Sequence, residues 1–359
     1  MEMPSLSGAR IAIIGGAGFV GSNLSHRLLE DDPQSLIIVD NLLSADASNI
    51  PDDPRVRFVE GSIADDEVLC ELPDDLDYVF HLACFHGNQS SIADPLRDHR
   101  NNSLTSLKLF EQLKDFPRLK KVVYAAAGCA VAKKTADDPA ATPEDAPVDL
   151  FHDSPYSISK LVGEMYGNYY FLRHQLPFVK ARFQNVYGPR EILGAGRWRG
   201  THHTVWRNVT PTFIFKALHG EALPLINGGQ DGRDFIFVGD LVEGLIRMAT
   251  HGEPGEAYNL ASGDETRILD LAEMINELTD NATPAAIEPA RDWDRSGRRY
   301  GDPEKSRKKL GFSTGTQLRT GLKGTIAWTK DNLETIKSCM ARHEEKVPEV
   351  RKYLSTGNN

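Results

Sequence analysis

Three glycines at a spacing of three residues separate an apolar run at residues 10–14 from a helical pattern that begins at Phe19. Glycine at such positions permits a tight turn, close approach of a pyrophosphate to backbone N–H groups, and close packing of helix on strand. The positive end of the following helix then faces the phosphates. The segment predicts a dinucleotide site formed by Gly15, Gly18, Phe19, Val20 and Gly21.

A second apolar run ends in an acid at Asp40, about 20 residues after the glycine turn. An acid at this position is suited to hold the adenosine ribose hydroxyls of a dinucleotide. Asn41 and the two leucines after it bring no arginine for a 2′-phosphate. The pattern therefore favours NAD over NADP.

Apolar runs and helical patterns alternate over the first 185 residues, which is typical of an α/β fold with a doubly wound parallel (Rossmann) sheet. We expect an NAD-binding domain at 1–185 and a smaller α/β substrate-binding region at 186–330. The chain is expected to return to the first sheet around 233–262. A charged helix and frayed tail without chemistry are expected at 331–359. The runs behind this interpretation are the strands at 56–59, 77–82, 121–124, 178–183 and 233–238, and the helices at 94–114, 155–174, 209–219 and 240–250.

Composition excludes several classes of function. The net charge of −10 argues against a nucleic-acid partner, which usually selects a basic protein. No apolar run reaches the length of a membrane helix, and the N-terminus lacks the pattern of a signal peptide. The four cysteines have neither metal-ligand nor disulfide spacing, so we expect no metal and a reducing cytoplasm.

Tyr156 and Lys160 have the YxxxK spacing at the start of the helix predicted for 155–174, for which Ser154 is the predicted N-cap. Residues four apart share one helix face, so the lysine charge is expected to lower the pKa of the phenol. A phenolate is a general base for a hydroxyl proton. The pair is therefore the candidate catalytic centre.

Together with His81-Leu82-Ala83 and the stretch from Arg182 to Pro189, these motifs resemble the extended short-chain dehydrogenase/reductase superfamily. Within it the chain is similar to the NAD-dependent nucleotide-sugar epimerases and dehydratases. The resemblance implies further cofactor contacts at Ser62, Ile63, Leu82, Ala83 and Asn101, with a serine at 62 where relatives carry an aspartate. It implies substrate contacts at His86, Gln184, Asn185, Asn208, Val209, Ile226, Arg233 and Arg291.

The chain departs from this family where relatives place a catalytic serine or threonine. Ala127 or Gly128 falls on that position, and Cys129 follows. One interpretation makes Cys129 an acid/base thiol, as in the similar 3,5-epimerases, and the other makes it a small buried filler. The acids that dehydratases and decarboxylases carry here are missing between residues 125 and 132.

The leading interpretation is an NAD-dependent epimerase that acts at C4 of a UDP- or dTDP-linked sugar through a 4-keto intermediate. The alternatives are a C3/C5 epimerase that uses Cys129 and a non-catalytic NAD- and nucleotide-sugar-binding regulator. The loop at 194–201 is expected beside the sugar, where its arginines would select a carboxylate or deoxy sugar, or would form a lid or a subunit contact. We expect a homodimer built from helices near 94–115 and 154–175, as in relatives, with an apolar stripe on the second helix formed by Ile158, Leu161, Met165, Tyr169 and Leu172.

Overall fold

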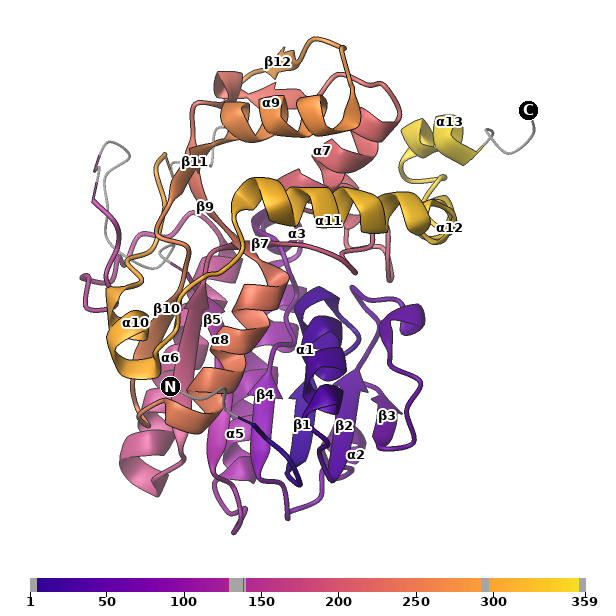
Figure 1. Cartoon of the computed structure of the whole chain (residues 1–359). Helices are drawn as coiled ribbons and strands as arrows, with labels where there is room; N and C mark the ends of the chain where they lie inside the picture. Colours follow the sequence, from indigo (N-terminus) through magenta and orange to yellow (C-terminus); the bar gives the residue numbers. More distant parts are fainter. Residues whose placement is uncertain (1–4, 129–137, 139, 292–296, 355–359) are drawn as a thin grey trace.

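The computed structural model describes residues 5–128, 138, 140–291 and 297–354. A seven-stranded sheet has the order β10-β6-β5-β4-β1-β2-β3, and all its neighbours are parallel (Figure 1). This confirms the predicted doubly wound sheet. The strands are β1 (Arg10–Ile14), β2 (Ser35–Asp40), β3 (Val56–Glu60), β4 (Tyr78–His81), β5 (Lys121–Ala127), β6 (Phe178–Phe183) and β10 (Ala257–Leu260).

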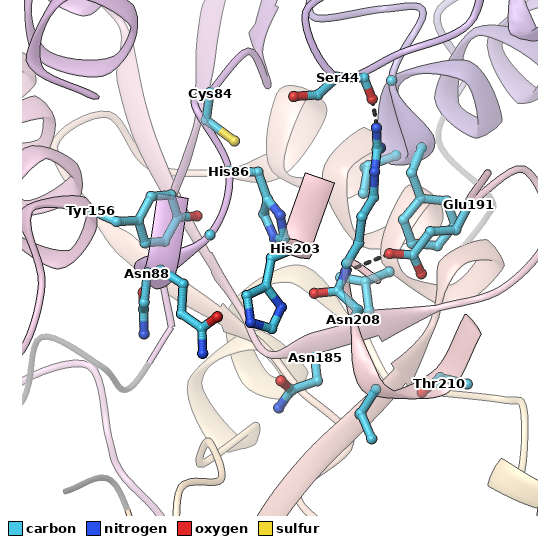
Figure 2. Close-up of a pocket in the computed structure, with 18 of the residues that line it drawn as sticks. Ser44, Cys84, His86, Asn88, Tyr156, Asn185, Glu191, His203, Asn208 and Thr210 are labelled. Atoms are coloured by element: carbon cyan, nitrogen blue, oxygen red, sulfur yellow. Dashed lines mark hydrogen bonds between the residues drawn. The ribbon is translucent and has the colours of Figure 1, made fainter. Parts of the chain in front are cut away.

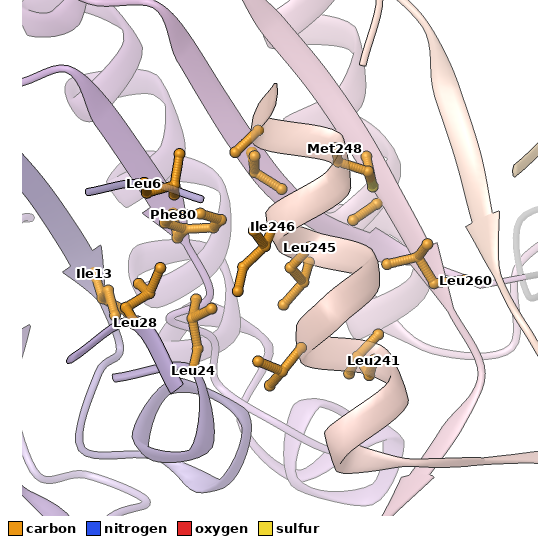
Figure 3. Packing of buried hydrophobic residues seen from close by; sticks show 14 of the residues in the cluster. Leu6, Ile13, Leu24, Leu28, Phe80, Leu241, Leu245, Ile246, Met248 and Leu260 are labelled. Atoms are coloured by element: carbon orange, nitrogen blue, oxygen red, sulfur yellow. The ribbon is translucent and has the colours of Figure 1, made fainter. Parts of the chain in front are cut away.

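Helices cover both faces of this sheet. On one face α1 (Phe19–Glu30) and α8 (Val238–His251) pack side by side, and Leu24 meets Leu245 in the core shown in Figure 3. The other face is covered by α2 (Asp66–Leu69), α5 (Thr105–Leu113) and α6 (Pro155–His174). Each fully buried leucine in such a core contributes about 1.5–3 kcal/mol relative to an exposed one.

The helix predicted over 94–114 runs without a gap from Pro95 to Leu113, as α4 (Pro95–His99), the π-helical η2 (Arg100–Leu104) and α5. It is preceded by α3 (Asn88–Ala93). In η2, Asn102 accepts a hydrogen bond from the Phe85 backbone N–H at 2.7 Å and donates to Asp98 Oδ1 at 2.7 Å. These contacts tie the helix to the loop after β4. The π-helical turn is thus accompanied by a tertiary hydrogen bond, and the periodicity of the sequence did not reveal it. Such turns are frequent at functional sites.

A smaller unit follows the sheet. Its core gathers buried residues such as Phe213, Leu225 and Leu271. The chain rejoins the large sheet through β10, which pairs with β6, whereas β9 pairs with β7 and β11. The elements are β7 (Asn185–Tyr187), α7 (Val209–Leu218), β8 (Pro224–Ile226), β9 (Gly232–Phe237), β11 (Glu265–Arg267), α9 (Ile268–Thr279), β12 (Ala286–Glu288), α10 (Glu304–Leu310) and α11 (Leu318–Asp331).

The C-terminal segment is packed rather than frayed up to Leu354. It comprises α12 (Leu333–Ala341), η6 (Pro348–Val350) and α13 (Arg351–Leu354). Met340 and Tyr353 are buried in a hydrophobic cluster with Trp206 and Phe215. The charged composition of the segment gave no indication of this cluster. Trp206 Nε1 also donates to Glu349 Oε1 at 2.6 Å. This segment was predicted to hold a charged helix and a frayed tail; up to Leu354 it is packed instead, because several of its apolar side chains are buried in this cluster.

Candidate active site

A cavity of about 1010 Å³ opens at the carboxyl ends of the parallel strands, where open α/β sheets bind their ligands (Figure 2). Every predicted site residue that the structure describes lines it, whereas Cys129 lies outside the described residues. The predicted residues that line the cavity are Gly15, Gly18, Phe19, Val20, Gly21, Asp40, Asn41, Ser62, Ile63, Leu82, Ala83, His86, Asn101, Ala127, Tyr156, Lys160, Gln184, Asn185, Asn208, Val209, Ile226, Arg233 and Arg291.

The glycine turn forms a cradle that fits a dinucleotide. Gly15 has φ +90°, and a Cβ there would lie 2.6 Å from the Ala83 backbone nitrogen. A Cβ at Gly21 would lie 2.2 Å from the Gly15 carbonyl oxygen. Gly18 is the N-cap of α1 and places no side chain on the first helical N–H groups. These groups therefore remain open to a pyrophosphate.

Asp40 has a structural contact as well as its predicted position. Its Oδ2 accepts from the Ala17 backbone N–H at 3.1 Å, and its Oδ1 accepts from Leu42 N–H at 2.9 Å. Burial raises the pKa of Asp40, and these backbone hydrogen bonds oppose the shift. Asp40 thus ties the end of β2 to the glycine turn. Ser62 Oγ is engaged locally, since it accepts from the Ala64 backbone N–H at 3.2 Å.

The first turns of α6 position Tyr156 and Lys160. Ser154 caps the helix by accepting from the Ser157 N–H at 3.3 Å, as predicted. Lys160 Nζ donates to the Ala125 carbonyl at 2.8 Å and lies 5.9 Å from the centroid of the Tyr156 ring. The expected lowering of the phenol pKa was wrong, because burial raises the pKa of Tyr156 and lowers that of Lys160. In the free protein the phenol therefore keeps its proton at neutral pH.

Packing distinguishes the two positions, Ala127 and Gly128, at which relatives could carry the catalytic serine or threonine. Ala127 is the last residue of β5 and is buried. A Cβ on Gly128 would lie 2.6 Å from the Phe183 carbonyl oxygen and 2.8 Å from Gln184 Oε1. Residue 128 therefore has no room for a serine or threonine, and among the described residues Ala127 is the position that could carry one.

Two side chains from the loop after β4 face the phenol. In Figure 2 Cys84 and His86 lie beside Tyr156, and the rings of His86 and Tyr156 are arranged edge to face with centroids 6.1 Å apart. Burial lowers the pKa of His86 to about 3, with smaller contributions from Arg199 and other cations. The imidazole is therefore neutral near pH 7 and is a weak base in the free protein. The sequence analysis passed over Cys84, although it directly follows the His81-Leu82-Ala83 motif.

The arginines of the 194–201 loop bond to backbone carbonyls rather than facing the sugar as expected. Arg197 donates to the Asn41 carbonyl at 2.5 Å. Arg199 is fully buried and donates to the carbonyls of His86 at 2.8 Å and His203 at 3.1 Å. A buried arginine is stabilised by such bonds because burial disfavours its charge. The loop therefore holds the cavity wall in place.

The other end of the cavity carries the polar groups expected to bind a diphosphate. Asn208 is the N-cap of α7, and its Nδ2 donates to Glu191 Oε1 at 2.5 Å. Asn185 Nδ2 donates to the Asp234 carbonyl at 3.2 Å. The Arg233 guanidinium donates to the Gly232 carbonyl at 2.9 Å. Arg291 also lines the cavity. These residues come from separate segments and meet only in the folded chain.

Eight charged residues that line the cavity were not predicted from the sequence: Glu191, Arg207, Lys216, Asp231, Glu288, Arg299, Glu349 and Lys352. Glu191 follows the Gly188-Pro189 motif, and Glu349 and Lys352 come from the C-terminal segment. Lys352 Nζ pairs with Glu221 at 2.7 Å. Nothing in the local sequence marks these residues, because their position depends on contacts between distant segments.

Within the described ranges, no group of three or more histidine, cysteine, aspartate and glutamate side chains is arranged to hold a metal ion. None of the helices in those ranges is long and apolar enough to cross a membrane.

The comparison with known proteins decides the family. The model of the NAD dependent epimerase/dehydratase family matches residues 11–261. The chain belongs to this family. As a member of the NAD-dependent epimerase/dehydratase family the chain is an NAD-dependent enzyme, so the resemblance and the cofactor inferred from sequence are confirmed and the non-catalytic alternative is wrong.

Several relatives of this epimerase/dehydratase share most of its length. The Bordetella bronchiseptica enzyme WbmF, solved in complex with NAD+ and UDP, is 58% identical, with coverage of 95% of this chain and 98% of that one and a TM-score of 0.86. The epimerase Mth375 of Methanothermobacter thermautotrophicus is 37% identical over 93% and 95% of the two chains, with a TM-score of 0.85. A putative UDP-glucose 4-epimerase of Methanocaldococcus jannaschii is 29% identical over 90% of this chain and all of that protein.

Proposed function

We propose that the enzyme epimerises a UDP-linked sugar at C4. The observation that carries this proposal is the shared cavity, which is lined by the glycine cradle, the Tyr156 phenol and the N-terminus of α7. The uridine assignment is supported by WbmF, which was solved with UDP. The carboxylate of Asp40 at the end of β2 would repel a 2′-phosphate, which favours NAD over NADP.

The side chains suggest how the reaction proceeds. Bound NAD would supply a hydride acceptor for the sugar carbon. Tyr156 would remove the proton of the C4 hydroxyl as hydride leaves C4, and the positive charge of Lys160 would favour the phenolate. The 4-keto sugar would then rotate in the site so that hydride returns to the opposite face of C4. Tyr156 would return the proton to the C4 oxygen. No atom is gained or lost, so product and substrate are isomers.

A second candidate is epimerisation at a carbon next to a keto group, at C3 or C5. It is favoured by the position of the His86 imidazole beside Tyr156 and by the absence of a hydroxyl at Ala127 and Gly128. In this reaction His86 would accept a carbon-bound proton, and a second acid would return a proton to the opposite face. Among the described residues, Cys84 is the thiol that lines the cavity and could supply this acid. Cys129 lies outside the described residues.

Isotope exchange separates the two reactions. We expect the NAD-loaded enzyme, given a panel of UDP-hexoses and 4-keto UDP-hexoses in D₂O, to interconvert C4 epimers without solvent deuterium at any ring carbon, because hydride is retained. NMR would read both product and label. Deuterium at C3 or C5 would transfer the assignment to the second candidate, and no conversion of either class would contradict both.

We also propose a homodimer formed through α6. Ile158, Met165, Tyr169 and Leu172 form an exposed apolar stripe on this helix, with Leu172 80% exposed. Their spacing of seven, four and three residues suits helix-on-helix packing. Leu161, which was expected in this stripe, is instead buried against Ala127. Burial of such a stripe in a second copy would remove its contact with water.

Light scattering tests the dimer. We expect wild-type protein at micromolar concentration to have twice the mass of the 39.8 kDa chain. Met165→Glu combined with Leu172→Glu should give a monomer, because two charges would be buried in the interface. Ile287→Glu, on the exposed strand β12, is the matched control and should leave the mass unchanged. A monomeric wild-type protein would contradict the proposal.

A further inference from the structure

Glu191 is a buried acid at the end of the cavity that is expected to hold the diphosphate. Its side chain is among the buried polar groups, with 5% exposure. One carboxyl oxygen accepts from Asn208 Nδ2 at 2.5 Å, and the other, Oε2, has no hydrogen-bond partner among the described residues. Figure 2 shows Glu191 beside Asn208, with Thr210 of the first turn of α7 nearby. The acid therefore lies at an anion-binding helix N-terminus with one oxygen unused.

The charges around Glu191 do not fully offset its burial. Arg207, in the segment before α7, is the cation whose field acts on it, and that guanidinium donates to the backbone carbonyls of Ser44 and Ala195. Cys339 of α12 faces the same guanidinium and keeps its proton, since burial raises its pKa to about 11. Burial raises the pKa of Glu191 to about 7, against the lowering effects of Asn208 and Arg207.

The two protonation states of Glu191 would meet a diphosphate differently. An ionised carboxylate repels the phosphates and has no proton to donate to them. A protonated carboxyl can donate from Oε2 to a phosphate oxygen, while its other oxygen still accepts from Asn208. The difference is large in a buried site, because screening by water is weak there.

We propose that Glu191 binds a proton together with the diphosphate of the substrate and is thereby a specificity-determining residue for the anionic nucleotide. This inference rests on the proposed function, since it assigns the diphosphate to the N-terminus of α7. It adds a proton to the binding step: the free carboxylate becomes a carboxyl, and the proton comes from solvent. Substrate affinity then falls as pH rises above neutrality.

Calorimetry of UDP-glucose binding to the NAD-loaded enzyme tests the proposal. Its diphosphate diester does not titrate near neutrality, so any proton taken up belongs to the protein. In buffers of different ionisation enthalpy we expect uptake of about one proton per ligand at pH 8 and about none at pH 5. The dissociation constant should rise about tenfold per pH unit above pH 7.

Glu191→Gln is the decisive variant, because an amide resembles the protonated acid: its oxygen accepts from Asn208, and its NH₂ can donate to phosphate. We expect this variant to bind UDP-glucose with nearly constant affinity and little proton uptake from pH 6 to 9. Glu288→Gln, an exposed carboxyl at the cavity rim, is the matched control and should retain the proton uptake of the wild type.

Thermal unfolding gives an independent reading. Because the pKa of Glu191 is raised in the folded state, its stabilising contribution is present below the unfolded pKa and is lost as pH rises through about 7. Glu191→Gln should therefore raise the Tm relative to wild type at pH 8 but not at pH 5.

The outcomes separate this inference from the proposed function. UDP-glucose binding without proton uptake, or with uptake that survives in Glu191→Gln, would overturn the role of Glu191 alone. A wild-type enzyme that does not bind UDP-glucose at any pH would overturn both.

Discussion

Tyr156→Phe is expected to reduce turnover by about 10²–10⁴-fold, the usual contribution of a positioned general acid or base. The substitution keeps the ring that packs against His86 and removes only the phenol oxygen. NAD binding should be unchanged, because the glycine cradle is untouched. NMR of sugar interconversion measures turnover, and the absorbance of nucleotide released on denaturation measures bound NAD.

Tyr124→Phe is the matched control. Tyr124 is buried beside the same lysine, and Lys160 Nζ lies 5.3 Å from its ring centroid. Its hydroxyl donates to the Lys160 backbone carbonyl at 3.3 Å rather than facing the cavity. This variant should retain most of its turnover. Full activity in Tyr156→Phe would show that the phenol is not the base, and His86 would then become the first candidate.

The pH dependence of turnover follows from the burial of Tyr156. Burial raises the pKa of this phenol, so the phenolate becomes more populated as pH rises through the alkaline range. Turnover limited by the base should therefore increase with pH, and Tyr156→Phe should lose that increase.

Gly21→Ala is expected to abolish NAD binding and to destabilise the fold. A Cβ at this position would lie 2.2 Å from the Gly15 carbonyl oxygen and 2.7 Å from Gly16 Cα, which are backbone atoms that cannot rotate away. The helix α1 must then move away from the cradle. Overpacking of this kind costs about 1–3 kcal/mol. Thermal unfolding and the NAD content of the purified protein provide the measurements.

Gly324→Ala is a matched control in the helix α11. A Cβ there would have no atom within 4 Å, so alanine should stabilise the exposed helix by up to about 1 kcal/mol. The opposite signs expected for the two variants isolate the close contact, since both replace a helical glycine by alanine. A Gly21→Ala protein that purifies with a full complement of NAD would contradict the cradle geometry.

The sequence by itself determined the parts of this protein that local spacing encodes. The glycine turn, the acid at Asp40 and the Tyr156–Lys160 pair each lie within one strand–turn or one helix turn, so their geometry follows from backbone periodicity. The alternation of strands and helices likewise predicted the parallel sheet. Ser154 as an N-cap was visible for the same reason, because a cap acts on residues within its own turn.

Tertiary structure alone decided the charge states and the contacts between distant segments. Lys160 was expected to lower the pKa of Tyr156, yet desolvation, which no local pattern reports, moves the pKa values of both residues toward their neutral forms. Asn102, in the π-helical turn, accepts a hydrogen bond from the Phe85 N–H, and Glu191 accepts one from Asn208, 17 residues away. Burial and long-range hydrogen bonds depend on the complete packing of the chain, so they became visible only once the fold had brought these residues together.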